Sequence, residues 1–409
     1  MKDFELYQQI LGLTAPWRVE NVTLNPKERE IEVRVSCEET LWGCPHCQRR
    51  MQLHDHEERR WRHLDSCQFK TLIIARVPVV RCPDHGAQTV AVPWAEKYGR
   101  FTRLFERFAI AVLLECSIAG ACKLLDISWA EADRIKQRAV KRGLARKVPE
   151  VMPHLCVDEK GMGHGHDYLT IVAEVKADQT TVQYVGEERR QASLDPFWKS
   201  LTAAQLTGVE AVAMDMWDPF IQSTLAHVPD AAEKIVHDPF HLVKYMNEAV
   251  NEVRKDEHRR LQTEGNDILT NTRQLWLYGM ENVPAAQARR FAAVKNLNLQ
   301  TARAWGIKEV FRSFWLCEAV PEAESYFRKW YGWAIRSQLE PVKKVARMCK
   351  THLKNILTFF THRLTNGPLE GLNNKIQGLI KKAYGYRNKE RFKTDIFFHL
   401  GGLDLYPAQ

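Results

Sequence analysis

Residues 154–175 decide the fold and read His-Leu-Cys-Val-Asp-Glu-Lys-Gly-Met-Gly-His-Gly-His-Asp-Tyr-Leu-Thr-Ile-Val-Ala-Glu-Val. Two apolar runs, Leu155–Val157 and Tyr168–Val175, flank a loop that carries three glycines, Gly161, Gly163 and Gly165. This pattern predicts a strand, a tight connection and a second strand. Asp158 stands where the first strand is expected to end, and on its own it is as typical of a solvated turn as of a functional site.

The following stretch alternates between strand and helix signals. Further strands are expected at 181–185, Val209–Met214 and Lys234–His237, and the last two are followed directly by Asp215 and Asp238. Helices are expected at about 194–205, from Asp218, and from Pro239 through Arg254. This order is expected of an α/β domain with a mixed sheet. From about 256 to 355 no strand signal remains, which predicts an all-helical insertion.

A later helix places one acid among polar side chains. Asn366-Gly367-Pro368 is typical of a helix start. On that helix Glu370 shares one stripe with Asn373, Asn374, Gln377 and Lys381. The opposite stripe is apolar and is expected to pack on the sheet, with Glu370 facing outward. The alternative is a capped surface helix with an ordinary glutamate.

Asp158, Asp215 and Glu370 could form one site. Three converging carboxylates repel one another unless cations lie between them. Hard oxygen ligands suit Mg²⁺ or Mn²⁺, and two such ions can activate a nucleophilic oxygen and stabilise the leaving oxygen of a phosphodiester. The spacing alone leaves open whether the three acids converge.

The N-terminal part carries a second set of metal-ligand residue types. Residues 22–37 alternate apolar and polar side chains and predict a strand. Cys44-Pro-His-Cys47 follows, and after 34 intervening residues comes Cys82-Pro-Asp-His85. Two such knuckles predict a structural zinc site in a ribbon, because four protein ligands leave no open position. The fourth ligand stays open between His85 and four other histidines, His46, His54, His56 and His63.

Basic residues are clustered in a chain of formal charge +9. Residues 134–147 hold seven Lys or Arg and no acid, and residues 375–393 hold seven with one acid. Such clusters favour a polyanionic partner, although each could be an ordinary solvated helix face. Apolar spacing over 101–114 and 117–125, then Ser128 with Glu131 as a capping box, predicts a helix-turn-helix. Its second helix would offer DNA four cations, Lys136, Arg138, Lys141 and Arg142; the alternative is a plain helical hairpin.

The chain shows no secretory signal, lipidation motif or apolar run of membrane-spanning length, so we expect a cytoplasmic protein. Its ten cysteines are then not expected to form disulfides.

The motifs that carry a family resemblance run through nearly the whole chain. They are Cys44-Pro-His-Cys47 with Arg81-Cys82-Pro, Ser117 with Ser128-Trp129, Val157-Asp158-Glu159, Met214-Asp215-Met216, His237-Asp238-Pro-Phe-His241, Thr365-Asn366-Gly367 with Glu370-Gly371 and Asn373, and Gly385-Tyr386-Arg387-Asn388. On these motifs the chain resembles bacterial insertion-sequence transposases of the DDE type, in the ISL3 family. His85 departs from the cysteine usual in the family's ribbon.

The resemblance implies an RNase H-like (retroviral-integrase-like) core interrupted before the Glu by a helical insertion. It carries catalytic, metal-binding roles onto Asp158, Asp215 and Glu370, with Mg²⁺ or Mn²⁺ as the cofactor. Three residues are expected to assist, Asp238, His241 and Asn373. Lys381 and Arg387 are expected to join the helix-turn-helix cations in binding DNA.

The expected domains are a zinc ribbon at 1–96, a helix-turn-helix at 97–150, the core at 151–255 and 356–409, and the insertion at 256–355. The expected function is a transposase that binds the terminal inverted repeats of its element, cuts the DNA and transfers the strand. Its partners would be element ends and target DNA, bound as a homodimer or higher oligomer without a membrane. The alternatives are a catalytically inactive transcriptional regulator and a resolvase-type nuclease without strand transfer.

Overall fold

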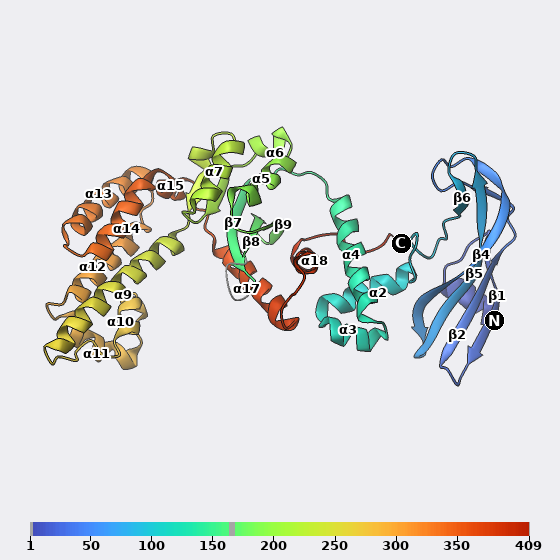
Figure 1. Cartoon of the computed structure of the whole chain (residues 1–409), viewed down its shortest axis with the longest axis horizontal. Helices are drawn as coiled ribbons and strands as arrows, with labels where there is room; N and C mark the ends of the chain where they lie inside the picture. The colour runs from blue at the N-terminus through green and yellow to red at the C-terminus, as the bar shows by residue number, and fades with distance from the viewer. Residues whose placement is uncertain (1–2, 163–167, 409) are drawn as a thin grey trace. The chain divides into compact units, whose positions relative to one another are not determined.

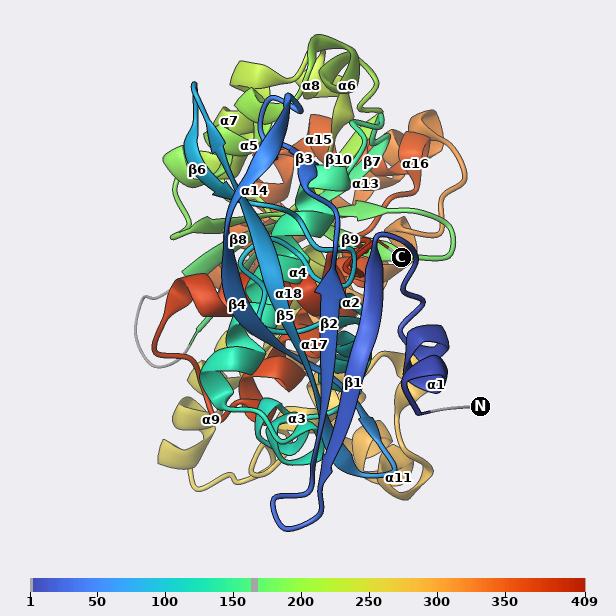
Figure 2. The same cartoon turned by 90° about the vertical axis from the view of Figure 1, so that its right-hand side faces the viewer.

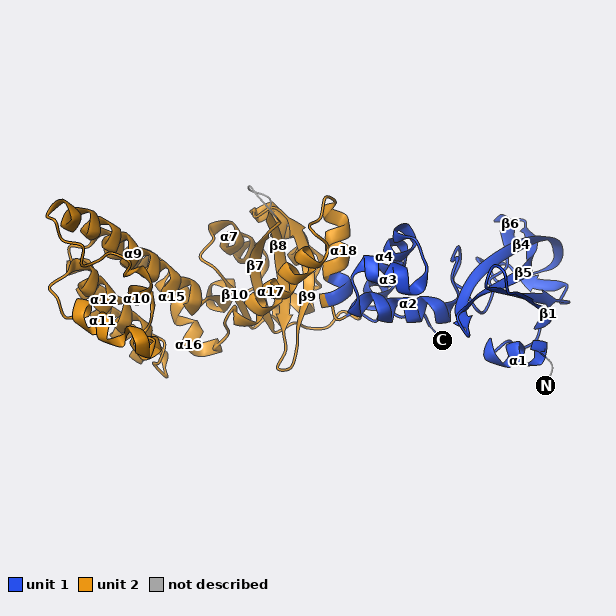
Figure 3. Ribbon diagram, turned by 90° about the horizontal axis from the view of Figure 1, so that it is seen from below, with its two compact units in different colours: residues 1–147, 397–399, 403–409 blue, residues 148–396, 400–402 orange. Residues whose placement is uncertain are grey.

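The computed structural model describes residues 3–162 and 168–408. Gly163 and Gly165 of the predicted connection, and the nearby acid Asp167, lie outside the described residues. The chain forms two compact units (Figure 3), of which the first comprises residues 1–147, 397–399 and 403–409 and the second residues 148–396 and 400–402. The last residues of the chain therefore belong mainly to the same unit as its first.

The first unit begins with helix α1 (Asp3–Ile10) and a six-stranded sheet. Its strands are β1 (Trp17–Asn25), β2 (Glu30–Cys37), β3 (Leu41–Gly43), β4 (Arg50–Ser66), β5 (Phe69–Cys82) and β6 (Gly86–Thr89). The strand order is β1-β2-β5-β4-β3, with β6 on β5, and Figure 2 shows β1, β2, β5 and β4 side by side. In the core of this sheet, the buried Trp94 ring contacts two other buried tryptophans. Its centroid is 4.9 Å from that of Trp17 and 5.4 Å from that of Trp61.

The single strand predicted over residues 22–37 was wrong. β1 and β2 are two antiparallel strands, and a turn over residues 26–29 joins them. Pro26 lacks the N–H that a strand interior needs, and Arg29 has a left-handed backbone with a φ of 54°. The alternation continues on both sides of the turn, which hid the break from the periodicity.

Three helices follow in the first unit, α2 (Arg103–Glu115), α3 (Ile118–Leu125) and α4 (Trp129–Arg146), as the helix-turn-helix pattern predicted. The capping box is present, because Glu131 N–H donates to Ser128 Oγ at 3.3 Å and Ser128 N–H donates to Glu131 Oε2 at 2.8 Å. The helices enclose a core of their own, to which the C-terminal segment contributes Phe398 and Leu405. The end of the chain is thus part of the helix-turn-helix core.

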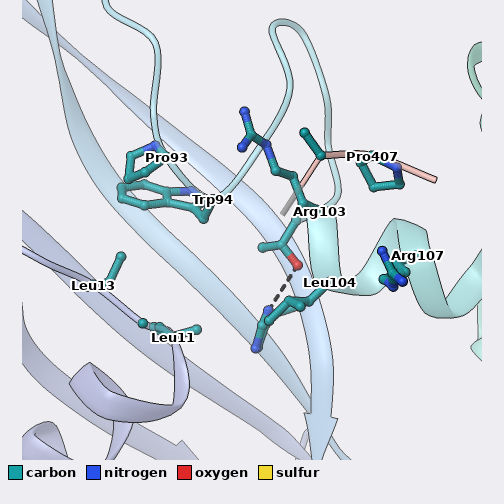
Figure 4. Close-up of a pocket in the computed structure, with 12 residues that line it drawn as sticks. Leu11, Leu13, Pro93, Trp94, Arg103, Leu104, Arg107 and Pro407 are labelled. Carbon is teal, nitrogen blue, oxygen red and sulfur yellow. Dashed lines mark hydrogen bonds between the residues drawn. The ribbon is translucent and has the colours of Figure 1, made fainter. Parts of the chain in front are cut away.

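A cavity of about 580 Å³ opens beside the first turn of α2 (Figure 4). Leu13 and Trp94 line it together with Arg103 and Arg107 of α2 and Pro407 of the C-terminal segment. Two further residues line it, His63 and Thr102, whose Nδ1 and Oγ1 form a 2.9 Å hydrogen bond. Burial lowers the pKa of His63 to about 4, so this histidine is a neutral core residue and not a free metal ligand.

The second unit is built on a five-stranded mixed sheet (Figure 1). Its strands are β7 (His154–Gly161), β8 (Tyr168–Val175), β9 (Thr180–Glu187), β10 (Ala211–Met214) and β11 (Ile235–His237). The order is β11-β10-β7-β8-β9, in which β7, β8 and β9 are antiparallel and β10 and β11 run parallel to β7. The predicted mixed sheet is present.

Helices connect these strands and continue beyond them. Those near the sheet are α5 (Gln191–Ser200), α6 (Ala203–Thr207), α7 (Asp218–His227), α8 (Ala231–Lys234), α17 (Gly367–Lys382) and α18 (Lys389–Leu400). The others are α9 (Pro239–Thr263), α10 (Arg273–Leu277), a 3₁₀ turn (Met280–Asn282), α11 (Ala285–Lys295), α12 (Gln300–Phe314), α13 (Val320–Arg336), α14 (Glu340–Thr351), α15 (Leu353–Leu357) and α16 (Phe359–His362).

Helix α9 joins the sheet to the helical part of the second unit. It starts beside β11 and packs along α10, α12 and α14, extending beyond the predicted end at Arg254 to Thr263. Residues 239–366 contain no strand, as the sequence predicted, and all of them are described. None of the helices in the described part of the chain is both long enough and apolar enough to cross a membrane.

Candidate active site and zinc site

Asp158 and Asp215 lie at the same level on neighbouring strands. In the parallel pair of β7 and β10, Val157 is opposite Met214, and each acid is the next residue along its strand. β10 ends at Met214, whereas β7 continues to Gly161 and pairs there with β8 alone. The prediction that Asp158 ends its strand was therefore wrong. The pairing partner of β7 stops just before Asp158, so the two acids lie directly beyond the last paired residues of β7 and β10.

The start of α9 adds an acid and a histidine to this place. Asp238, which is only 3% exposed, is the N-cap residue of α9 directly after β11. His241 in the first turn lies with Nδ1 3.4 Å from Asp215 Oδ2 and Nε2 4.0 Å from Asp238 Oδ2. Tyr245, one turn later, donates its hydroxyl to Asp215 Oδ2 at 3.2 Å. The sequence analysis missed Tyr245, although its spacing from Asp238 and His241 places all three on one helix face.

The charges of this cluster are strongly coupled. Burial raises the pKa of Asp158 and that of Asp238, because it disfavours the charged carboxylate. Burial also acts to raise the pKa of Asp215, but its hydrogen bond and charge interaction with His241 prevail and the pKa is lowered. The same hydrogen bond raises the pKa of His241. The cluster therefore contains three acids, Asp158, Asp215 and Asp238, and one titratable cation, His241. This charge balance favours the binding of additional cations.

Helix α17 is fixed to the cluster at three points. Asn373 donates Nδ2–H to Asp158 Oδ2 at 2.8 Å, and the backbone N–H of Asn366 donates to the Asp238 carboxylate. The Cys156 thiol on β7 lies 3.5 Å from the carbonyl oxygen of Thr365. Leu369, Leu372 and Ile376 of the predicted apolar stripe are buried, so the helix packs as the sequence indicated.

Glu370 lies one turn before Asn373 on α17, and its side chain is exposed. Among the described residues, Asp158, Asp215 and Glu370 do not form a group whose ligand oxygens all lie within 4.8 Å of one another. The structure thus places the three acids on adjoining elements, with Asp158 and Asp215 adjacent in register and Glu370 at the open side.

A cation–aromatic contact borders the acids and was not predicted. Arg189 pairs with Glu159 at 2.7 Å, and its guanidinium lies 3.9 Å from the ring centroid of Trp217. The Trp217 Nε1–H donates to the Arg189 carbonyl at 3.0 Å. This contact joins the loop after β9 to the loop that carries Asp215. Glu159 is therefore engaged in a structural pair, and Asp218 is an exposed first-turn residue of α7.

The zinc-ligand prediction is matched by geometry in the first unit. Cys44, Cys47, Cys82 and His85 each offer a ligand atom, and these atoms all lie within 4.8 Å of one another. Cys82 Sγ is 3.3 Å from His85 Nδ1, and Cys47 Sγ is 3.7 Å from Cys82 Sγ. A backbone N–H bond from Cys47 lowers the pKa of Cys44 to about 7, which favours the thiolate that binds metal. Three thiols and one imidazole at this separation fit a structural zinc ion.

His85 thus takes the fourth position that the sequence left open. The ring of His46 stacks on that of His85, with centroids 5.1 Å apart, and its Nε2 contacts Lys97 Nζ at 3.3 Å. His54 and His56 lie on β4, outside the cluster. The zinc knuckles begin where β3 and β5 end, which is where a ribbon needs them.

Of the four helix-turn-helix cations predicted to face DNA, Lys136 and Arg142 lie in the interior, and Arg138 is half-buried with 30% of its side chain exposed. Lys136 is buried, and Arg142 is 10% exposed and forms a two-bond pair with Glu96 at 2.8 and 2.9 Å. Arg138 and Arg142 both bind buried Glu106 at 2.7 Å. Because Lys136 and Arg142 are enclosed in the unit, their predicted DNA contacts were wrong, whereas the contact predicted for the half-buried Arg138 stays a prediction. Lys141 remains exposed on α4.

The second predicted basic site is exposed. Lys381 lies in the last turn of α17 and Arg387 in the loop before α18, and both side chains are solvent-accessible. Neither forms a salt bridge within the described residues.

Three family models match the chain. One described as a transposase, the ISL3 DDE type, covers residues 155–396, which is more than half of the chain. The chain belongs to the ISL3 family of transposases. Further models match the zinc finger of transposases IS204, IS1001, IS1096 and IS1165 over residues 40–85 and the helix-turn-helix domain of ISL3 transposases over residues 90–140. The predicted family, its transposase activity on DNA and its DNA-binding helix-turn-helix are confirmed.

Two curated relatives of this ISL3 transposase are each described as the transposase of an insertion sequence element. The transposase of IS1001 from Bordetella parapertussis is 25% identical, with 85% of this chain and 86% of the relative aligned. The transposase of IS1557 from Mycobacterium tuberculosis is also 25% identical, with 95% of this chain and 94% of the relative aligned. The similarity therefore spans both compact units.

Proposed function

We propose that Asp158, Asp215 and Glu370 are the catalytic carboxylates of this transposase. The observation that supports this most directly is the register of β7 and β10, which sets Asp158 beside Asp215, together with the Asn373 bond that fixes the Glu370 helix to Asp158. Their donor atoms are carboxylate oxygens, the ligands that Mg²⁺ and Mn²⁺ prefer. Two such ions would activate the attacking oxygen and stabilise the leaving oxygen of the phosphodiester.

The neighbouring side chains have supporting roles in this proposal. Asn373 donates to one oxygen of Asp158 and the Glu159 N–H donates to the other, and these two bonds fix the orientation of the carboxylate toward a metal ion. His241 and Tyr245 hold Asp215 in its orientation, and His241 offsets part of the local negative charge. Asp238 fixes the start of α17 through the Asn366 N–H, which makes it a positioning residue. Water would cut the element end, and the freed 3′ hydroxyl would then attack target DNA.

We further propose that the second unit has an RNase H-like core interrupted by a helical insertion. Its support is the sheet order, a three-stranded antiparallel meander with two parallel strands added beside its first strand. The proposed domains are the ribbon at 1–96, the helix-turn-helix at 97–150, the core at 151–255 and 356–409, and the insertion at 256–355. Within residues 356–409, Phe398 and Leu405 pack on the helix-turn-helix. We propose that the first unit recognises the terminal inverted repeats and that the protein acts on DNA as a homodimer or higher oligomer.

The test is cleavage of a labelled element end in Mg²⁺ or Mn²⁺. Asp158→Asn and Asp215→Asn keep the shape of each side chain but remove a charge, so cutting should fall by orders of magnitude because the acids act as one unit. Binding of the end should persist, which distinguishes loss of chemistry from loss of fold.

Asp218→Asn is the matched control, since Asp218 is an exposed acid only three positions from Asp215. It should cut normally. Normal cutting by Asp158→Asn, or a loss from Asp218→Asn as large as that from Asp215→Asn, would refute the assignment.

A further inference from the structure

Tyr384 is the most exposed large hydrophobic side chain of the described residues, with 100% of its surface accessible. It follows α17, whose first turn carries Glu370, and stands in the loop before α18. Within the described part of the chain no aromatic ring and no cation lies against it. A whole tyrosine ring in water is unfavourable unless a partner covers it, because aromatic side chains carry a large apolar surface.

The backbone at Tyr384 is also unusual for its residue type. The end of α17 is a Schellman motif, in which Gly385 N–H donates to the Ile380 carbonyl at 2.9 Å and Tyr384 N–H to the Lys381 carbonyl at 3.2 Å. The left-handed position of this motif is normally glycine, but here Tyr384 occupies it with a φ of 55°, and the glycine comes one residue later. Helix capping therefore gives no reason for a tyrosine at this position, and the strained backbone holds its ring away from the helix.

The surroundings of Tyr384 are basic. Lys381 and Arg387 flank it and are exposed, and neither makes an ion pair within the described residues. The one acid among residues 375–393, Glu390, pairs with Lys393 at 2.8 Å, and Lys393 also pairs with Glu187 at 2.9 Å. Tyr386 points inward, since its hydroxyl donates to Asp395 at 2.6 Å. Tyr384 is thus a single aromatic ring among cations, without the apolar neighbours that a protein partner would need.

We propose that Tyr384 stacks on a base that has left the base stack of the element-end duplex being cut, while Lys381 and Arg387 bind the flanking phosphates. Bases stack on aromatic side chains in a sequence-tolerant way, and a basic surround holds the backbone in place. The inference rests on the proposed function in one respect, because Glu370 locates the cut. Tyr384 lies fourteen positions after Glu370, so at 1.5 Å rise per residue their backbones lie roughly 21 Å apart along α17, about six base pairs of a B-DNA duplex that runs along the helix.

The experiment uses the full-length protein and a duplex that carries the DNA bordering its gene. 2-Aminopurine, whose fluorescence rises when it leaves the base stack, is placed at one position after another. We expect a rise at one or two adjacent positions about six base pairs from the cut. Tyr384→Ala should abolish the rise and weaken binding about five- to tenfold, as expected for loss of one base–aromatic stack, whereas Tyr384→Phe should keep both.

Tyr98→Ala is a matched control. Tyr98 is 76% exposed, has a φ of 62° and is also followed by glycine, but the Lys97 ammonium lies over its ring at 5.2 Å. This variant should leave the fluorescence profile unchanged. The proposal is overturned by a profile that does not depend on Tyr384, by an equal effect of Tyr98→Ala, or by an effect of Tyr384→Ala confined to the target duplex.

Asp215→Asn separates this inference from the proposed function. A fluorescence rise that persists in this non-cutting variant supports the stacking contact on its own. Normal cutting by Asp215→Asn would remove the proposed catalytic site, and loss of the Tyr384-dependent rise alone would remove only the stacking contact.

Discussion

Two groups of potential metal ligands in this transposase differ in how close their ligand atoms lie to one another. The ligand atoms of Cys44, Cys47, Cys82 and His85 already lie within 4.8 Å of one another, whereas the three proposed catalytic carboxylates form no such group within the described residues. The first group is made of two pairs, each three residues apart, on one sheet. The carboxylates come from two strands and a helix, at positions 158, 215 and 370.

This difference separates a metal site that holds a fold from one that does chemistry. Four protein ligands saturate a zinc ion, so its binding free energy goes into the folded structure. An open carboxylate site leaves coordination positions for water and a phosphodiester, and its charge repulsion without metal makes it a poor stabiliser. Losing a zinc ligand should therefore affect the fold, and losing a carboxylate should affect the reaction.

The largest effect on stability is expected from the zinc site. Cys82→Ser should release zinc and unfold the knuckles around 41–52 and 79–89, because structural zinc contributes about 10 kcal/mol or more to folding in small zinc domains. Metal analysis and hydrogen exchange measure both losses. Cys67→Ser changes an exposed cysteine outside the cluster and should retain zinc and fold. A Cys82→Ser protein without zinc but with native exchange would contradict the structural role.

An effect of several kcal/mol is expected where a cation was mistaken for a DNA contact. Arg142→Ala leaves Glu106, whose side chain is 3% exposed, with one buried partner fewer, and such a loss costs about 3–5 kcal/mol of unfolding free energy. Chemical denaturation measures the change, and Glu106→Gln in the same protein should recover part of it. Lys141→Ala, on the exposed side of α4, should change stability by no more than about 0.5 kcal/mol. If the Arg142→Ala and Lys141→Ala proteins had equal free energies of unfolding, Arg142 would have no structural role, and its predicted DNA contact would stand again.

A smaller effect is expected from the buried histidine that lies outside both metal groups. The pKa of His63 is about 4 in the folded protein, against about 6.5 in the unfolded chain. Between these pH values only the unfolded chain binds a proton at His63. The contribution of neutral His63 to the free energy of unfolding is therefore complete above pH 6.5 and falls by up to about 3 kcal/mol as the pH falls towards 4.

Denaturation of His63→Gln beside the unmodified protein measures this share. The variant cannot titrate there, so the two stability–pH curves should converge as the pH falls from 7 to 4. Parallel curves would show that His63 does not titrate on unfolding.

The sequence predicted features that local spacing controls. The zinc knuckles, the Ser128–Glu131 capping box and the start of α17 depend on residues within one turn or one loop, and each is where it was expected. The predicted strand over residues 22–37 failed because one turn interrupts an alternation that otherwise continues. The position of Glu370 one turn from Asn373 could likewise be predicted from helical periodicity.

Other features depend on partners far along the chain. The pairs of Arg142 with Glu96 and Glu106 span 46 and 36 positions, and no spacing in the sequence indicates which side of α4 faces inward. The bond from Asn373 to Asp158 spans 215 positions and exists only because β7 and α17 pack together. For the same reason, the residue types suggested that the three acids could share a metal site, but the sequence alone did not predict where in the fold they lie relative to one another.

The central claim is that the open carboxylate site performs the chemistry, and Glu370 is its most exposed member. Glu370→Gln keeps the length of the side chain, the α17 packing and the Asn373 bond, and removes only the charge. Cleavage of a labelled element end in Mg²⁺ should then fall by orders of magnitude, with zinc content, thermal unfolding and end binding unchanged. Normal cleavage by Glu370→Gln would contradict the claim, because a site of Asp158 and Asp215 alone would then suffice.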